Sequence, residues 1–207
     1  MGLYNNEALF PGTATLNQFR LAQLVATELN NDLSAMTVPP LETAWYARSA
    51  SSLTYARSDY AFGEINNLTI EDEFDATIIE VAFHDNAEDA KLMRDPKARN
   101  AMARAAYQGL VRYFNEFDGA PLTFIPEPPG NVRAMASNRF ILVSWQAGGS
   151  AGGTATGYLV YRSTNGYGFG QPEYASTTSY TFTNLAINTT YYFRVTATNA
   201  GGESLFS

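Results

Sequence analysis

Four prolines fall within ten residues of this chain, in the stretch PLTFIPEPPG from Pro121 to Gly130. Proline fixes its own φ angle and pushes the preceding residue toward an extended conformation, so this stretch is stiff and continues no helix. Helix-forming segments and short apolar runs precede it, and alternating segments rich in Thr, Tyr, Ser and Gly follow it. The sequence therefore predicts a domain at residues 1–120, a Pro-rich linker at 121–129 and a second domain at 130–207.

Charge is distributed unevenly between the two halves. Residues 1–126 hold 9 Lys/Arg and 17 Asp/Glu, a net charge of −8, and residues 127–207 hold 4 and 3, a net charge of +1, which together give −7. An acidic first half without a basic stripe argues against a nucleic-acid partner. No apolar stretch approaches the roughly 20 residues of a transmembrane helix. The absence of cysteine excludes disulfides and cysteine-ligated zinc.

The first half opens with a helix signal and continues into a stretch without a clear period. A helix capped by Thr13 or Thr15 is expected to run to about Leu33, with its apolar residues on one 3.6-residue face. The residues of that face are Leu21, Leu24, Val25 and Leu29. The prolines of Val38 to Pro40 stop any helix. The stretch from Leu41 to Asp75 is either an aromatic loop beside a cleft or ordinary packing; its aromatic residues include Trp45, Tyr46, Tyr55, Tyr60 and Phe62.

An apolar run and two helix starts follow. Residues 76–83 are expected to form a strand. Asn86 has the properties of an N-cap with acidic residues in the first turn, and Asp95-Pro96 is a second cap followed by proline at the first helical position. The buried stripe of the last helix is expected to comprise Met102, Ala106, Gly109, Leu110, Tyr113 and Phe117. This pattern indicates an α/β domain whose apolar strand is covered by helices on both faces.

A carboxylate, Glu80, lies in the middle of the apolar run. An unpaired ionised carboxylate in a buried strand is unfavourable, so it needs a partner or a chemical role. One interpretation is a structural ion pair with Arg57 or Arg94. A glycosidase acid of the chitinase type, D-x-x-D-x-D-x-E, is a second interpretation, but Ile78 stands where that motif needs an aspartate. That spacing excludes the glycosidase interpretation.

A third interpretation follows from two short motifs. The pattern E-x-G-F-x-x-N is matched except at Ala82, which replaces the glycine, and a later pattern G-I-x-x-Y-F is matched in part. The matching residues are Glu80, Phe83, Asn86, Gly109, Tyr113 and Phe114. In these motifs residues 1–118 resemble the C-terminal part of the zinc-dependent N-acetylmuramoyl-L-alanine amidases of the amidase-3 type. The fold implied is a partial amidase sheet with covering helices.

The resemblance implies a hydrolase of peptidoglycan, located outside the cell or in the cell envelope. Zn²⁺ would activate a water, and Glu80 would be the catalytic base in cleavage of the amide between N-acetylmuramic acid and L-alanine. The family holds zinc with two histidines and a glutamate upstream of these motifs, whereas this chain has one histidine, His84, at a non-ligand position near the expected cleft mouth. No residue is therefore assigned to metal or cofactor binding, and the chain is expected to be an inactive fragment. The alternative is a non-enzymatic cell-envelope binding protein with a metal-free amidase-like domain.

The second half has the pattern of an all-β sandwich. Four short strands are expected, in RFILVSW, TGYLVYRS, TSYTFTNL and TYYFRVTATN, and the string Gly166, Gly168 and Gly170 is expected to be a turn. With Trp145 in an early strand and Tyr191 before a late one, residues 127–207 resemble a fibronectin type III domain. The chain ends at Ser207, where the last strand is expected to be incomplete and to leave an open sheet edge.

Overall fold

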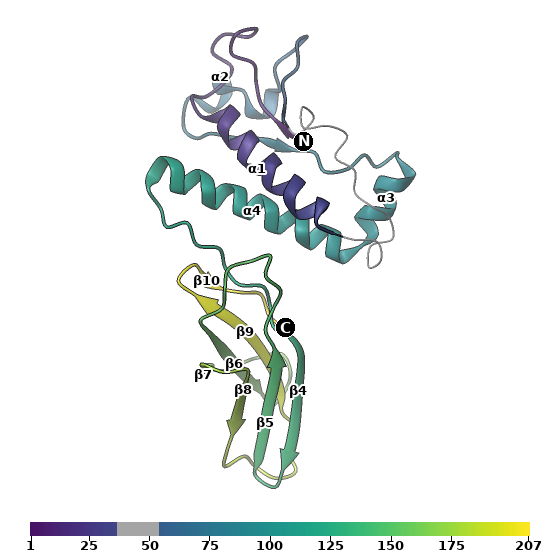
Figure 1. Ribbon diagram of the computed structural model, residues 1–207, viewed down its shortest axis with the longest axis vertical. Coiled ribbons are helices and arrows are strands. Elements are labelled where there is room, and N and C mark those ends of the chain that lie inside the picture. Colours follow the sequence, from purple (N-terminus) through teal and green to yellow (C-terminus); the bar gives the residue numbers. More distant parts are fainter. Residues whose placement is uncertain (37–53) are drawn as a thin grey trace. The chain divides into compact units, whose positions relative to one another are not determined.

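The computed structural model describes residues 1–36 and 54–207 (Figure 1). The chain divides into two compact units, Met1–Leu122 and Thr123–Ser207, which we call unit 1 and unit 2. The expected helix stop at 38–40 and the aromatic residues Trp45 and Tyr46 lie outside the described residues. No helix in the described ranges combines the length and the apolar character needed to cross a membrane.

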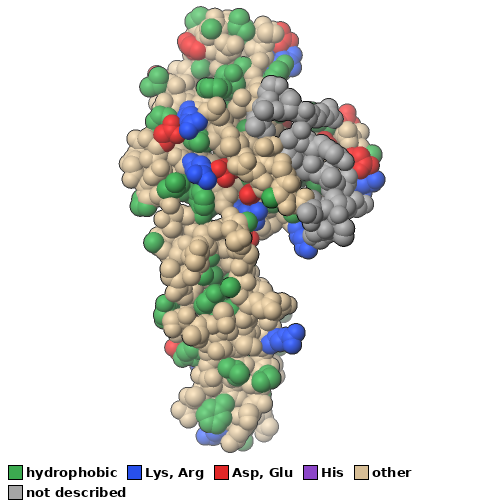
Figure 2. All heavy atoms as spheres, viewed as in Figure 1, with side chains coloured by type: hydrophobic (Ala, Val, Ile, Leu, Met, Phe, Trp, Pro, Cys, Tyr) green, Lys and Arg blue, Asp and Glu red, His purple; other side chains and the backbone are tan. Residues whose placement is uncertain are grey.

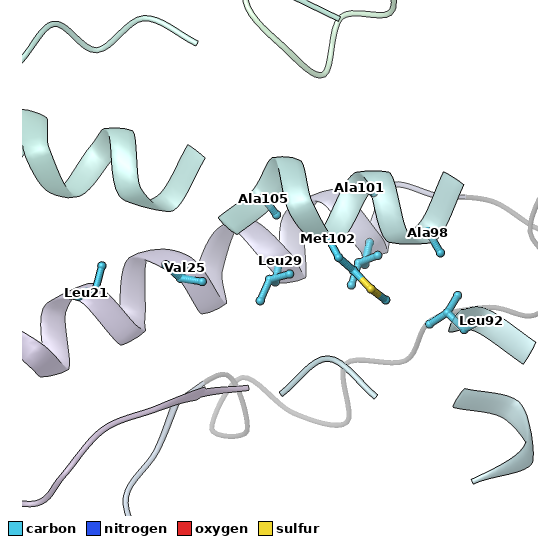
Figure 3. Close-up of a cluster of buried hydrophobic side chains, with 9 residues drawn as sticks. Leu21, Val25, Leu29, Leu92, Ala98, Ala101, Met102 and Ala105 are labelled. Carbon is cyan, nitrogen blue, oxygen red and sulfur yellow. The ribbon is translucent and has the colours of Figure 1, made fainter. Parts of the chain in front are cut away.

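Unit 1 is held together by a pair of long helices. Helix α1 (Gln18–Ser34) packs against α4 (Pro96–Asp118), and their apolar side chains face one another, with Leu92 of α3 (Ala87–Arg94) completing the cluster (Figure 3). The buried members are Leu21, Val25, Leu29, Leu33, Leu92, Ala98, Ala101, Met102 and Ala105. The predicted apolar face of the first helix is thereby confirmed, because Leu21, Leu24, Val25 and Leu29 are all buried.

The helix starts match the sequence in two of three cases. The Asn86 side chain accepts hydrogen bonds from the backbone N–H groups of Glu88 (3.0 Å) and Asp89 (3.1 Å), and Asp95 accepts one from Lys97 (2.8 Å). The predicted cap of α1 is wrong: the helix begins at Gln18 without a side-chain cap. The hydroxyls of the two threonines bond elsewhere, Thr13 to the Phe10 carbonyl and Thr15 to Asp75.

The predicted stripe of α4 is right at its start and wrong toward its end. Met102 and Gly109 are buried, whereas Leu110 and Phe117 are 43% and 41% exposed. The face that contacts α1 instead continues through Arg112 and Glu116, whose side chains form ion pairs with α1. Arg112 and Glu116 therefore bind α1 by charge. The apolar side chains of Leu110 and Phe117 are exposed to solvent instead.

Within residues 1–36 and 54–122, the sheet of unit 1 has three strands of two residues each. They are β1 (Gly2–Leu3), β2 (Thr54–Tyr55) and β3 (Ile78–Ile79), in the order β2-β1-β3, with β1 parallel to β2 and antiparallel to β3. Helix α1 lies against this sheet and α4 lies on the other side of α1 (Figure 1). Of the strand predicted at 76–83 only Ile78 and Ile79 are formed as β3, and the segment leaves the sheet instead of continuing as a buried strand.

Two short helical segments and buried amide side chains complete unit 1. The short helices η2 (Gly63–Ile65) and α2 (Asn67–Ile70) connect β2 to β3. The buried Asn5 side chain donates to the carbonyls of Thr13 (3.1 Å) and Phe62 (3.1 Å), and the buried Gln18 side chain accepts from the Asn5 N–H (2.7 Å). These bonds join the N-terminal loop, the start of α1 and the segment around η2, which the short strands alone could not hold.

Unit 2 is a sandwich of two antiparallel sheets. One contains β4 (Gly130–Ser137), β5 (Phe140–Gln146) and β8 (Ser179–Phe182) in the order β4-β5-β8. The other contains β6 (Gly157–Ser163), β7 (Glu173–Ala175), β9 (Tyr192–Asn199) and β10 (Gly202–Glu203) in the order β10-β9-β6-β7. The four predicted strands are all present. The core between the sheets comprises Val143, Trp145, Tyr158, Val160, Ala175, Phe182, Leu185, Val195 and Ala197.

The last strand, β10, is two residues long. After the Gly202 turn it bonds to β9, and the backbone N–H groups of Ser204 and Ser207 donate to the carbonyls of Ala197 (2.8 Å) and Val195 (3.0 Å). The β9 edge is therefore paired from Val195 to Asn199. The glycine string lies in the turn between β6 and β7, where the Asn165 side chain accepts from the N–H groups of Tyr167 and Gly168, as predicted for a turn.

Candidate functional site

Glu80 directly follows β3 and is the one residue that the sequence assigns to catalysis. Its backbone N–H donates to the Met1 carbonyl (2.9 Å), and its carbonyl accepts from the Met1 ammonium, so the backbone pairing of β1 and β3 extends by one residue. The side chain is exposed, which corrects the expectation of a buried carboxylate. The reason is the length of β3: Glu80 lies at the point where the segment leaves the sheet.

The structural ion pair proposed for Glu80 is not formed. Its carboxylate makes no hydrogen bond or salt bridge with any residue that the structure describes, and Arg57 pairs with Asp59 at 2.6 Å instead. Its charge acts on the Met1 ammonium: desolvation lowers the pKa of that ammonium, and the Glu80 carboxylate partly opposes this shift. Glu80 is therefore a solvated carboxylate, and packing does not explain its presence.

The residues around Glu80 do not fit a zinc ion. Within residues 1–36 and 54–207, no three His, Cys, Asp or Glu side chains come together as a potential metal site. His84 is exposed, four residues after Glu80, and is the sole histidine of the whole chain. A site of two histidines and one glutamate needs a second histidine, which this sequence does not contain.

The other residues of the two motifs have structural roles. Asn86 caps α3, and the N–H of Phe83 donates to the Asp89 carboxylate (2.8 Å), which fixes the turn between β3 and α3. Gly109 lies where α4 crosses α1: a Cβ at this position would be 2.7 Å from the Val25 Cα. The exceptions are the side chains of Phe83 and Phe114, which are 52% and 47% exposed.

A cluster around Asp75 was not predicted as a site from the sequence. The Asp75 carboxylate accepts hydrogen bonds from the hydroxyls of Thr15 and Tyr113 and from the N–H of Asn17 (3.2 Å). It thereby joins the segment before β3 to the start of α1 and to α4. A tyrosine on a helix stripe that is otherwise apolar was the sequence signal for such a partner.

The electrostatics of this cluster follow from the same contacts. Desolvation raises the pKa of Asp75, but the hydrogen bonds from Thr15, Tyr113 and Asn17 outweigh it, so the pKa lies below its ordinary value of 3.8. Desolvation and the Asp75 carboxylate raise the pKa of Tyr113 to about 12. At neutral pH the cluster is therefore an ionised carboxylate bound to a protonated phenol, which suits a structural junction better than proton transfer.

In unit 2 the distinctive geometry is at the start of β9. The Tyr191 hydroxyl accepts a hydrogen bond from the N–H of Ala186 (3.0 Å), which forms a tyrosine corner, and Trp145 is buried against Tyr158 with ring centroids 5.3 Å apart. The family model of the fibronectin type III domain matches residues 127–207. Residues 127–207 are a fibronectin type III domain. The resemblance predicted from the sequence is confirmed for this part of the chain.

Solved structures similar to the chain cover about two fifths of it. The titin kinase with its flanking domains is 32% identical over 41% of this chain and 16% of that chain, with a TM-score of 0.38. A run of titin domains is 34% identical over 40% of this chain and 30% of that chain, also at 0.38, and FN3tt mut is 23% identical over 40% and 90%, at 0.35. The chain thus spans less than a third of either titin structure. The comparison with curated proteins found no match.

Proposed function

We propose that unit 1 is the Glu80-bearing part of a peptidoglycan hydrolase domain, one that cleaves the amide between N-acetylmuramic acid and L-alanine. The observation that supports this proposal is the exposed, unpaired Glu80 at the end of β3. Of the residues shared with the amidase motifs, Asn86, Gly109 and Tyr113 are accounted for by packing and hydrogen bonds. The Glu80 side chain is not, and neither are the exposed rings of Phe83 and Phe114. An exposed carboxylate has the access to solvent and substrate that a group taking part in proton transfer needs.

The role proposed for Glu80 is proton transfer. An exposed carboxylate can accept a proton from the water that attacks the amide carbonyl and deliver that proton to the leaving amine of alanine. The described residues do not provide a zinc site for the carbonyl, so we propose that this chain does not turn over substrate by itself. Because peptidoglycan lies outside the cytoplasmic membrane, the proposed location is extracellular or in the cell envelope.

Binding of muramyl dipeptide, which contains the amide in question, tests this assignment. We expect titration of the full chain, followed by ¹⁵N NMR, to shift the amide signals of residues 80–84, and Glu80→Gln to reduce these shifts. Glu64→Gln is the matched control, because Glu64 is also exposed, lies in unit 1 and belongs to neither motif. Shifts that are absent, or that respond equally to both substitutions, would remove Glu80 from the site.

A non-enzymatic cell-envelope binding protein is the second candidate. The observation that favours it is the single, exposed histidine, since a protein that only binds the wall needs no metal ligands. Co-sedimentation of the full chain with purified peptidoglycan sacculi separates the two candidates. Binding that Glu80→Gln leaves intact, together with no response of residues 80–84 to muramyl dipeptide, would support the binding protein. Release of stem peptides by this chain alone would contradict both candidates as stated.

A further inference from the structure

The outward face of the larger sheet of unit 2 is rich in aromatic and polar side chains. On β9, Val195 and Ala197 point into the core, so the alternating residues Tyr192 and Arg194 point outward. Tyr161 of β6 is directly opposite Arg194 in the sheet register and shares this outward face. Tyr192 and Phe206 are each 46% exposed. An outward sheet face normally carries small polar or charged residues, so exposed aromatic rings here need an explanation.

Arg194 lies at the centre of this face, between aromatic rings. Its guanidinium carbon is 4.5 Å from the centroid of Phe169 and 5.1 Å from that of Phe206. Phe206 in turn packs edge-on against Tyr161, with centroids 5.4 Å apart. Among the described residues no carboxylate pairs with Arg194. The guanidinium thus makes cation–π contacts with two rings, and its N–H groups donate no hydrogen bond to a described residue. These donors can bind an anion such as a carboxylate in a bidentate manner.

An acceptor lies beside this donor. The Oε1 atom of Glu203 accepts hydrogen bonds from the Tyr161 hydroxyl (2.6 Å) and from the Thr196 hydroxyl (2.6 Å). These bonds fix the Glu203 carboxylate on the outward face, and its Oε2 atom makes no hydrogen bond within the described part of the chain. The face thus combines the Arg194 guanidinium, which can bind an anion, the Glu203 carboxylate, which can accept a hydrogen bond, and exposed aromatic rings.

We propose that this face binds a polysaccharide that carries carboxylate groups. The apolar C–H face of a sugar ring stacks on an exposed aromatic ring such as Phe206 or Tyr192. The sugar carboxylate pairs with Arg194, and a sugar hydroxyl donates to Glu203. This inference concerns unit 2 and does not depend on the function proposed for unit 1.

A glycan fits these observations better than an acidic peptide. Glu203 repels further carboxylates but accepts from hydroxyls, which a sugar has in number and an acidic peptide lacks. A peptide strand would also need a free sheet edge, but β10 covers the β9 edge and β7, at the other edge, is three residues long. A face on which two aromatic rings contact an arginine instead suits sugar rings that follow one another along a chain.

Isothermal titration calorimetry of the full chain with defined hexasaccharides tests the proposal. The probes are the hexamers of galacturonate and mannuronate and the hexasaccharide of hyaluronan, with methyl-esterified hexagalacturonate as the uncharged match. We expect at least one acidic hexasaccharide to bind, the ester to bind at least tenfold more weakly than its acid, and Arg194→Gln to weaken binding at least tenfold. Arg133→Gln, an exposed arginine on β4 of the other sheet, should leave the affinity unchanged.

Each other outcome contradicts the proposal. If no acidic hexasaccharide binds, or if Arg194→Gln and Arg133→Gln weaken binding equally, the face is not a specific site. If hexaglutamate binds as tightly as the best hexasaccharide and with the same dependence on Arg194, the ligand is an acidic peptide. Phe206→Ala removes a stacking ring but no charge. It should therefore weaken binding of the acidic hexasaccharide and of its methyl ester by the same factor. A thermal melt of each variant, followed by circular dichroism, verifies that unit 2 remains folded.

Discussion

The two units of this chain are held together in different ways. In unit 2, strands of seven or eight residues pair along most of their length, and alternation alone places Val143, Val160 and Val195 in the core. In unit 1, strands of two residues contribute few ladder bonds. A helix pair and the side chains of Asn5, Gln18 and Asp75 hold its loops instead. In unit 1, where the strands are short, side-chain hydrogen bonds therefore connect segments that are far apart in the sequence.

The largest expected effects come from core truncations, one in each unit. Leu29→Ala should destabilise unit 1, and Phe182→Ala should destabilise unit 2, by about 2–5 kcal/mol each, because both side chains are buried in their clusters. Urea unfolding followed by amide NMR signals assigned to each unit measures this directly. If either substitution lowered the midpoints of both units equally, the two cores would form one cooperative system and the comparison would fail.

Gly109→Ala should have the next largest effect and should act on unit 1 alone. A methyl group at this position would lie 2.7 Å from the Val25 Cα, so the helices must separate. The expected loss is about 1–3 kcal/mol, which outweighs the gain of up to about 1 kcal/mol from helix propensity. Gly63→Ala is the control, because no heavy atom lies within 4 Å of its added carbon. An equal loss in the two variants would show that α1 and α4 do not cross as closely as described.

The Asp75 junction should make unit 1 acid-sensitive. Because the pKa of Asp75 is lower in the folded protein than its ordinary 3.8, its stabilisation is complete above about pH 4 and is lost as the pH falls through the lowered pKa. We expect Asp75→Asn to reduce the free energy of unfolding of unit 1 by about 1.5–3 kcal/mol at neutral pH. The difference from the natural chain should shrink below pH 4, as measured by urea titrations across pH. A difference independent of pH would mean that the carboxylate charge is not involved.

Removal of one hydroxyl gives a smaller and more evenly matched comparison. Tyr113→Phe removes the hydroxyl that bonds to Asp75 in unit 1, and Tyr191→Phe removes the acceptor of the tyrosine corner in unit 2. Each should reduce the free energy of unfolding of its own unit by about 0.5–1.5 kcal/mol. Because the pKa of Tyr113 is raised to about 12, its contribution should be present below pH 10 and be lost as the pH rises toward 12. A pH-independent effect of Tyr113→Phe would contradict this junction.

The same contrast explains how far the sequence predicted the molecule. In unit 2 strict alternation and Tyr191 identify strands, core and family, because these signals are local. In unit 1 the caps at Asn86 and Asp95 are equally local and were predicted correctly. The extent of the strand at 76–83 was not predicted correctly. Composition shows how apolar a segment is, but it does not show how many residues will pair with neighbouring strands.

The prediction of the candidate site from the sequence was limited for the same reason. The sequence singled out Glu80, but its burial was inferred from apolar neighbours, and the structure places it where the strand ends. Asp75 was passed over because its partners, Thr15 and Tyr113, are 60 and 38 residues away in the chain. Contacts of that kind have no signature in a local window.

The most direct test of the account is the stability of Glu80→Gln. If Glu80 serves chemistry and not the fold, removal of its charge should change the free energy of unfolding of unit 1 by less than about 0.5 kcal/mol, since the side chain is exposed and unpaired. Urea unfolding of unit 1, with Glu64→Gln as the matched control, gives this number. A loss of about 3–5 kcal/mol, the effect expected when a buried ion pair is broken, would show that Glu80 is a structural carboxylate and would contradict its proposed role.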